Sequence, residues 1–157
     1  PEFTVAILKT KSNKLIVSPI EIVPEASENG LRILGEKAKK DDNEIIRKNT
    51  DRMLTSRLKR LAIAVFNELG ISDCGKNDIK TNHSGECYFM EANLVPGMTR
   101  SSSYFPKACK SEHGYSYDKI IEMILDSCID RIPQTLLPPI NMNPVTGLSS
   151  PTLALAT

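Results

Sequence analysis

The segment 75–99 constrains the fold of this chain more than any other stretch. It contains two extended runs, 75–80 and 86–93, which are separated by the Thr-Asn-His-Ser-Gly sequence of residues 81–85. Asn, Ser and Gly are typical of tight turns, because they form local hydrogen bonds or adopt backbone angles that other residues avoid. Two extended runs around such a connection predict an antiparallel β-hairpin.

Side chains alternate between the two faces of a strand, so the position of the turn fixes which residues meet. With the turn centred just before its glycine, Ile79 is expected to face Met90. Asp78 is then expected to face Glu91, on the opposite side of the sheet. The apolar side chains expected on the buried face are Ile79, Tyr88, Met90 and Ala92.

Two carboxylates that face each other across a pair of strands repel, so Asp78 and Glu91 need a positive partner. Asn93 follows on the same face as Glu91, with Lys76 expected across from it. Carboxylate and amide oxygens are the ligands that Mg²⁺ prefers, so this face is a candidate metal site. The alternative is an exposed polar face on which Lys76 and Lys80 form salt bridges with the acids.

Two longer strings carry a resemblance to a known family. Residues 90–99 read Met-Glu-Ala-Asn-Leu-Val-Pro-Gly-Met-Thr, with Tyr-Phe-Pro at 104–106. This segment closely resembles the metal-binding segment of the D-alanine–D-alanine ligases, which belong to the ATP-grasp superfamily of carboxylate–amine ligases. Residues 1–8, Pro-Glu-Phe-Thr-Val-Ala-Ile-Leu, resemble the family's strand after the adenine-side hinge. The resemblance extends more loosely to about Leu125.

The resemblance implies a fold and a reaction. The expected fold is α+β, an antiparallel sheet with helices on one side, similar to the C-terminal half of an ATP-grasp domain. The implied reaction is ATP-dependent amide formation through an acyl phosphate, as in peptidoglycan biosynthesis, with ATP and two Mg²⁺ ions as cofactors. By this resemblance Asp78 holds one ion, Asn93 holds the other, and Glu91 bridges both.

Three further residues are implied to contact the nucleotide. Glu2 matches the family's glutamate that holds the ribose hydroxyls. The alternative interpretation is that Glu2 is an ordinary solvent-facing acid. Met90 is a candidate adenine-packing residue, although core packing explains it equally well. Lys39 lies in the segment 24–50, which corresponds to the family's mobile nucleotide-covering loop, and aligns with a lysine that reaches the phosphates. Its alternative is a solvated basic helix face.

Catalytic roles are implied for Lys76 and for a serine. The family has an arginine that steadies the oxyanion formed during transfer, where this chain has Lys76 in Gly-Lys-Asn-Asp. Lysine keeps the charge but loses the bidentate guanidinium fork. In the family a serine helps to bind the carboxylate of the acceptor amino acid. Counting forward from Thr99 selects Ser102, and counting back from Pro106 selects Ser103. Each could instead be a simple turn or N-cap serine.

In a ligase of this family, a glycine-rich loop, two nucleotide-binding lysines and a substrate domain precede the Pro-Glu-Phe-Thr string. The expected partners are therefore the N-terminal half of the enzyme, ATP and amino-acid substrates, and the chain alone is expected to be inactive. Apolar surface left uncovered could also pair with a second copy in a homodimer. Two other hypotheses stay open: a ligase of the superfamily with a different amino-acid or peptide substrate, and a degenerate module that serves as a binding or scaffold protein.

Composition excludes several other classes. The chain has 157 residues with 20 Lys and Arg against 19 Asp and Glu, so no basic field favours nucleic-acid binding. No apolar run is long enough to span a bilayer and no signal peptide is evident, so we expect a cytoplasmic protein without membrane contact. The four cysteines are scattered without a Cys-x-x-Cys pair and are expected to be reduced thiols.

The remaining elements follow from local patterns. Alternation predicts a second hairpin from 2–9 and 15–23, in which Pro19 favours an edge position or a bulge. A leucine-rich stripe predicts a helix over 51–69 that ends at a glycine, and a second helix is expected to begin at Ser116. Residues 1–131 thus form the expected ATP-grasp subdomain. The Pro-rich segment 132–157 is expected to be a linker or disordered tail.

Overall fold

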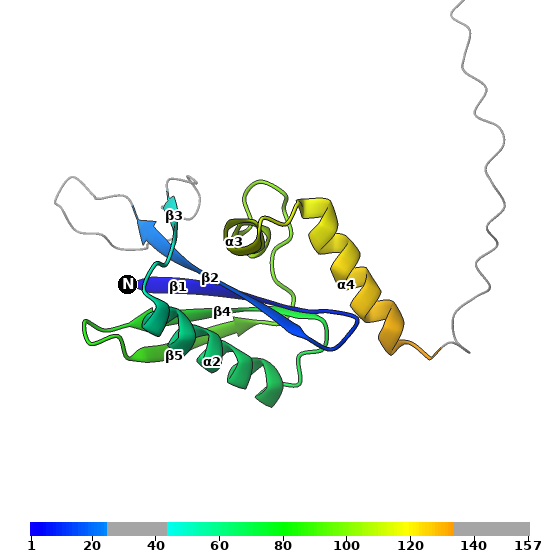
Figure 1. The fold of residues 1–157 in the computed structure, drawn as a ribbon, viewed down its shortest axis with the longest axis horizontal. Coiled ribbons are helices and arrows are strands. Elements are labelled where there is room, and N and C mark those ends of the chain that lie inside the picture. The colour runs from blue at the N-terminus through cyan, green and yellow to red at the C-terminus, as the bar shows by residue number, and fades with distance from the viewer. Residues whose placement is uncertain (25–43, 134–157) are drawn as a thin grey trace, which may run out of the picture.

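The computed structural model describes residues 1–24 and 44–133, and its core is one antiparallel sheet with the strand order β3-β2-β1-β4-β5 (Figure 1). The strands of this sheet are β1 (Glu2–Lys9), β2 (Leu15–Pro24), β3 (Glu44–Lys48), β4 (Cys74–Thr81) and β5 (Cys87–Asn93). The helices are α2 (Arg52–Glu68), α3 (Tyr104–His113) and α4 (Tyr117–Arg131). The α+β prediction is therefore confirmed.

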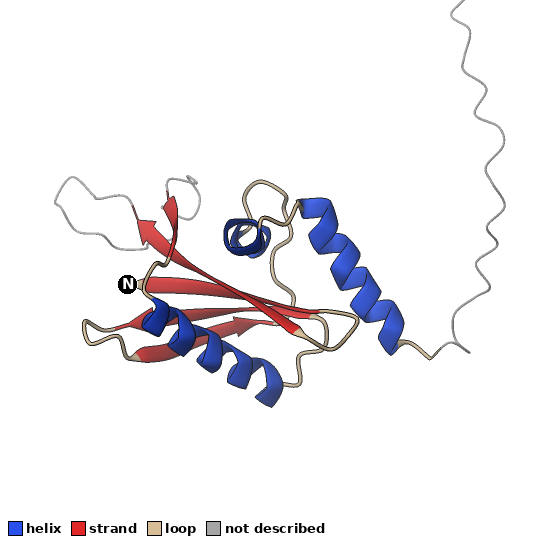
Figure 2. Cartoon of the chain, in the orientation of Figure 1, coloured by secondary structure: helices blue, strands red, loops and turns tan. Residues whose placement is uncertain are grey.

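Helices cover both faces of the sheet, whereas we expected them on one side only (Figure 2). Strand β1 shows why, because its alternate side chains enter two separate cores. Phe3, Val5 and Ile7 pack with the residues of α2, and Ala6 and Leu8 pack with those of α3 and α4. A central strand that is apolar on both faces needs a cover on both.

The first hairpin is confirmed, since β1 and β2 pair from Glu2 opposite Ile22 to Lys9 opposite Leu15. Pro19 lies within this ladder without a shift of register. On its other side β2 pairs with β3 only from Ile20 onward. At Pro19 β2 therefore pairs with β1 alone, and this position is a local edge, one of the two predicted alternatives.

The predicted loop 24–50 contains a strand that we did not expect. Residues 44–48 form β3, which pairs antiparallel with the last residues of β2. Its short length gave no clear alternation in the sequence, and its partner lies across a long connection. Residues 25–43, including Lys39, lie outside the described residues, as does the predicted tail from residue 134.

Helix α2 follows its sequence signals closely. The Asp51 carboxylate caps it by accepting hydrogen bonds from the amides of Met53 and Leu54, at 2.8 and 3.1 Å. Beyond its end, Gly70 adopts a φ of 63°, the left-handed geometry that favours glycine after a helix. The side chains that it buries completely are Leu58, Ala62 and Phe66. The predicted leucine stripe is thus shifted, with Leu54 and Leu61 at its margin and Leu69 exposed.

Helix α4 begins after Ser116, as predicted, because the Ser116 hydroxyl accepts a hydrogen bond from the Lys119 amide at 3.2 Å. At its other end, the Arg131 guanidinium contacts the Asp73 carboxylate at 2.6 Å, just before β4. This ion pair fixes α4 against the sheet. None of the helices in the described parts of the chain has the length and apolar character that crossing a membrane requires.

The second hairpin forms, but its register changes part-way along. Asp78 pairs with Glu91, as predicted, whereas Ile79 pairs with Phe89 and not with Met90. Met90 is the extra residue of a β-bulge. The bulge overturns the predicted buried face, since Tyr88 and Met90 are 53% and 51% exposed.

Candidate metal and nucleotide site

The candidate site lies on the face of β1, β4 and β5 opposite α2. Strand alternation directs a set of polar side chains to this face, since their neighbours Phe3 and Ile79 pack toward α2. These polar residues are Glu2, Thr4, Lys76, Asp78, Lys80, Glu91 and Asn93. Residues from three strands therefore meet on one surface, although Thr4 was not expected among them.

Asp78 is held by contacts with Thr4 and Lys76 on this surface. The Thr4 hydroxyl donates a hydrogen bond to its Oδ1 at 2.8 Å. The Lys76 ammonium lies 2.9 and 2.6 Å from its two carboxylate oxygens. Both side chains are largely buried, with exposures of 12% for Lys76 and 13% for Asp78. The ammonium also lies 5.9 Å from the centre of the Tyr104 ring, within the range of a cation–π contact.

Glu91 and Asn93 complete the predicted constellation on β5. Glu91 is directly opposite Asp78, and Asn93 is directly opposite Lys76, so both predicted pairings are confirmed. The Asn93 amide donates to Glu91 Oε1 at 3.3 Å, which shows that the two side chains contact each other. Glu91 is exposed, unlike Asp78.

The donor chemistry of these residues fits Mg²⁺, because two carboxylates and an amide oxygen are all hard ligands. Within the described residues, no three His, Cys, Asp or Glu side chains gather into a metal cluster. A metal here would therefore depend on Asn93 and on ligands from water or phosphate. Lys76 now supplies the positive charge beside Asp78, as the salt-bridge alternative expected.

The predicted nucleotide contacts lie apart in the sheet, with Glu2 on β1 and Met90 in the bulge of β5. Glu2 lies opposite Lys80 in the β1–β4 ladder, and the Lys80 ammonium is 3.6 Å from its carboxylate. Met90 projects from the bulge with half of its surface exposed, so core packing does not explain it. Lys39 cannot be placed, because it falls in 25–43.

The two serine candidates differ in their surroundings. Ser103 is the N-cap residue of α3, and its hydroxyl accepts a hydrogen bond from the Thr99 amide at 2.8 Å. Ser102 is exposed and has no side-chain hydrogen bond within the described residues. A Cβ on Gly97 would lie 2.9 Å from Ser103 Oγ, so a larger residue there would displace the Ser103 hydroxyl.

Tyr117 also holds this turn, and sequence reasoning missed it. Its hydroxyl donates to the Met98 carbonyl at 2.8 Å, and the Arg100 guanidinium lies 4.4 Å from its ring centre. Arg100 in turn contacts Asp118 at 2.6 Å. The one available signal was Tyr117 at the first position of α4, which does not reveal a contact with a distant turn.

All four cysteines are free, in agreement with the prediction of reduced thiols. Burial raises the pKa of Cys74 and of Cys109 to about 11, so both remain protonated at neutral pH. Burial also lowers the pKa of His113, whose ring stacks on Tyr115. Cys74 shares the face of β4 that carries Lys76 and Asp78, but it packs with the core that contains Ala6 and Leu8.

The matching family model is described as the D-ala D-ala ligase C-terminus, and it covers residues 1–126. The chain belongs to this family. The D-alanine–D-alanine ligase of Paraburkholderia phymatum is 40% identical over 70 residues, which are 45% of this chain and 22% of that protein. The enzyme of the same name from Acinetobacter baumannii is 36% identical over 74 residues, or 47% of this chain and 23% of that protein.

Solved ligases of the family show the same fold. The Bacillus anthracis D-alanine–D-alanine ligase complexed with ATP has a TM-score of 0.63 at 24% identity, covering 82% of this chain and 38% of its own. The Coxiella burnetii D-alanine–D-alanine ligase has a TM-score of 0.62 at 18% identity, covering 83% of this chain and 32% of its own. The chain thus corresponds to well under half the length of the ligases that it matches.

Proposed function

We propose that this chain is the Mg²⁺- and nucleotide-binding C-terminal part of an ATP-dependent carboxylate–amine ligase of the cytoplasm, similar to D-alanine–D-alanine ligase. The observation that carries the proposal is the Asp78–Glu91 pair, with Asn93 beside it on a face that also holds Glu2. Opposed carboxylates repel each other. Lys76 contacts Asp78, and a metal ion that joins Asp78 to Glu91 would neutralise Glu91 as well, which supports the proposal.

In the proposed reaction, the substrate carboxylate takes the γ-phosphoryl group of ATP and becomes an acyl phosphate. The amine of an amino acid then attacks the acyl carbon, the amide bond forms, and inorganic phosphate leaves. Bound Mg²⁺ would neutralise the charge on the phosphate oxygens, and Asp78, Glu91 and Asn93 would hold it. The family favours D-alanine as both acid and amine.

Each residue of this chain has a distinct task in that proposal. Glu2 would accept hydrogen bonds from the ribose hydroxyls, and Met90 would pack against the adenine. Lys76 would direct its ammonium toward the developing oxyanion, in a site whose low exposure strengthens the charge. Ser102 or Ser103 would bind the carboxylate of the acceptor amino acid, and Lys39 would contact the phosphates.

Metal binding by the chain itself tests this proposal. Mn²⁺, a paramagnetic substitute for Mg²⁺, should selectively broaden the NMR amide signals of residues 78, 91 and 93. Asp78→Asn and Glu91→Gln should each remove most of that broadening. Asp130→Asn, at an exposed acid on α4, is the matched control and should leave it unchanged. Broadening that persists in both site variants would show that these acids do not hold the metal and would contradict the proposal, and a parent chain without selective broadening would favour the scaffold hypothesis.

A further inference from the structure

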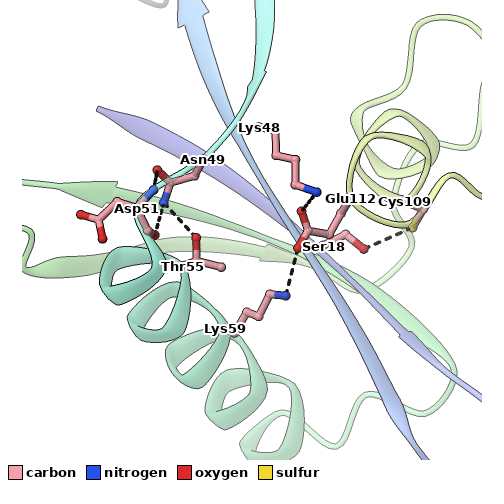
Figure 3. A network of polar contacts seen from close by, with 8 residues as sticks. All are labelled: Ser18, Lys48, Asn49, Asp51, Thr55, Lys59, Cys109 and Glu112. Carbon is pink, nitrogen blue, oxygen red and sulfur yellow. Dashed lines mark hydrogen bonds and ion pairs between the residues drawn. The ribbon is translucent and has the colours of Figure 1, made fainter.

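A cleft of about 850 Å³ lies at the opposite edge of the sheet from the Asp78–Glu91 pair. It is bounded by the end of β3, the first turns of α2 and the end of α3 (Figure 3). Its size is within the range of small-ligand sites. Four of its lining residues are cationic, namely Lys48, Arg52, Lys59 and Arg60, and one is acidic, Glu112.

Glu112 organises the two lysines of this basic cleft. Its largely buried carboxylate, with 13% exposure, lies 3.3 Å from the Lys48 ammonium and 3.1 Å from that of Lys59. Figure 3 shows it between the two, which come from β3 and α2. These ion pairs hold the pKa of Glu112 below its usual range, although burial acts in the opposite direction. One carboxylate thus fixes two cations and neutralises the charge of only one.

The arginines of the cleft have no such partner. Arg52 and Arg60 form no ion pair or side-chain hydrogen bond within the described residues, and Ser56 lies midway between them. A spacing of four residues places all three on one stripe of α2. With four cations and one acid, the lining has a formal charge of +3.

The N-terminus of α2 also lies at this cleft, and no acidic residue lies in the first turn of the helix. The nearest acid is the N-cap Asp51, whose carboxylate is already occupied by the amides of Met53 and Leu54. Asp51 does not line the cleft. Figure 3 shows its carboxylate directed away from Lys59 and Glu112. The cap therefore offsets the partial positive charge of the helix end, and the excess charge of the cleft comes from its four cationic side chains.

We propose that this basic cleft binds a small anion that bears phosphate, at a site separate from the proposed ligase site. Guanidinium groups bind phosphate oxygens with paired hydrogen bonds, and the hydroxyls of Thr55 and Ser56 supply further donors. A nucleic acid is disfavoured, because the chain as a whole has a charge of only +1. The positive charge is concentrated in one cleft, which suits a compact ligand.

The test is an NMR titration of the chain with sodium pyrophosphate at constant ionic strength, with EDTA present to exclude metal. Saturable shifts should be centred on residues 48–60 and on residue 112. Parallel titrations with inorganic phosphate and with ribose 5-phosphate distinguish a free phosphate from a phosphate ester. Whichever anion binds most tightly identifies the ligand class.

Arg52→Gln and Arg60→Gln should each weaken binding by at least tenfold. Arg57→Gln is the matched control, since it removes the same charge from α2, but its guanidinium contacts the Gly85 carbonyl of the distant hairpin. It should change binding by less than twofold. An equal loss in all three variants would show a non-specific charge effect and overturn the proposal, as would shifts that do not saturate.

Discussion

Asn77 offers the sharpest test of the packing between the sheet and α2. Its side chain is completely buried, and its amide nitrogen donates to the Ala62 carbonyl at 3.1 Å. Its amide oxygen has no hydrogen-bond partner and is the only such buried side-chain atom within the described residues. A buried acceptor left unpaired costs about 1–3 kcal/mol. We therefore predict that Asn77→Val stabilises the chain.

The magnitude follows from what this substitution removes and what it keeps. Valine is close to asparagine in size and favours strands, so it should fit β4 without a large cavity. The bond to Ala62 is lost, at a net cost of about 0.5–1.5 kcal/mol. The Ala62 carbonyl nevertheless keeps its bond within the helix, so no new unpaired group results. The balance is a gain of about 1 kcal/mol.

Urea unfolding followed by far-ultraviolet circular dichroism measures this gain. The midpoint should rise while the slope with denaturant stays constant, since the surface exposed on unfolding hardly changes. Asn77→Asp is the contrasting variant, because it buries a charge at the same place and should strongly destabilise. A lower midpoint for Asn77→Val would refute the reasoning, since it would mean that the amide oxygen is bonded in solution.

Two further predictions concern charged pairs. The hydrogen bond from Arg131 holds the pKa of Asp73 below its usual value, so this pair stabilises the fold above pH ~4 and its contribution is lost as the pH falls through the lowered pKa. Asp73→Asn should therefore lower the unfolding temperature at pH 7, and the difference should shrink in scans toward pH 3. Lys76→Ala should strengthen Mn²⁺ binding to the chain, because the ammonium beside Asp78 is removed. In a complete ligase the same change should lower kcat by about 10²–10³, whereas Lys76→Arg should preserve it, and a kcat within a few-fold of the parent for Lys76→Ala would contradict the proposed role.

Local signals in the sequence were enough to predict the elements that are defined by their own residues. The leucine stripe and the glycine after it predicted α2, because both signals lie within or directly beside the helix itself. The parity of the hairpin predicted the Asp78–Glu91 and Lys76–Asn93 pairs. Near the turn the observed register differs by one residue, and the bulge restores the predicted register before these pairs.

Contacts between distant segments could not be predicted in the same way. Thr4 donates to Asp78 across 74 residues of sequence, and no local pattern pairs β1 with β4. The same limit applies to β3, whose pairing with β2 requires closure of a long connection. For the same reason the helices on the second face of the sheet were not predicted, since the sequence of one strand does not show which helix will pack on it.

The bulge at Met90 shows why strict alternation succeeded for the acids but failed nearer the turn. Glu91 must lie opposite Asp78, away from α2, whereas Cys87 packs in the core beneath that helix. These positions are four residues apart, an even spacing, so regular alternation would place both on one face. One extra residue between them changes the parity. Met90 leaves the ladder, and Phe89 takes its place opposite Ile79. Glu91 and Cys87 can then lie on opposite faces of the sheet. Bulges of this kind re-aim side chains beside functional sites, and the one here lets β5 direct Glu91 to the polar face while Cys87 packs in the core.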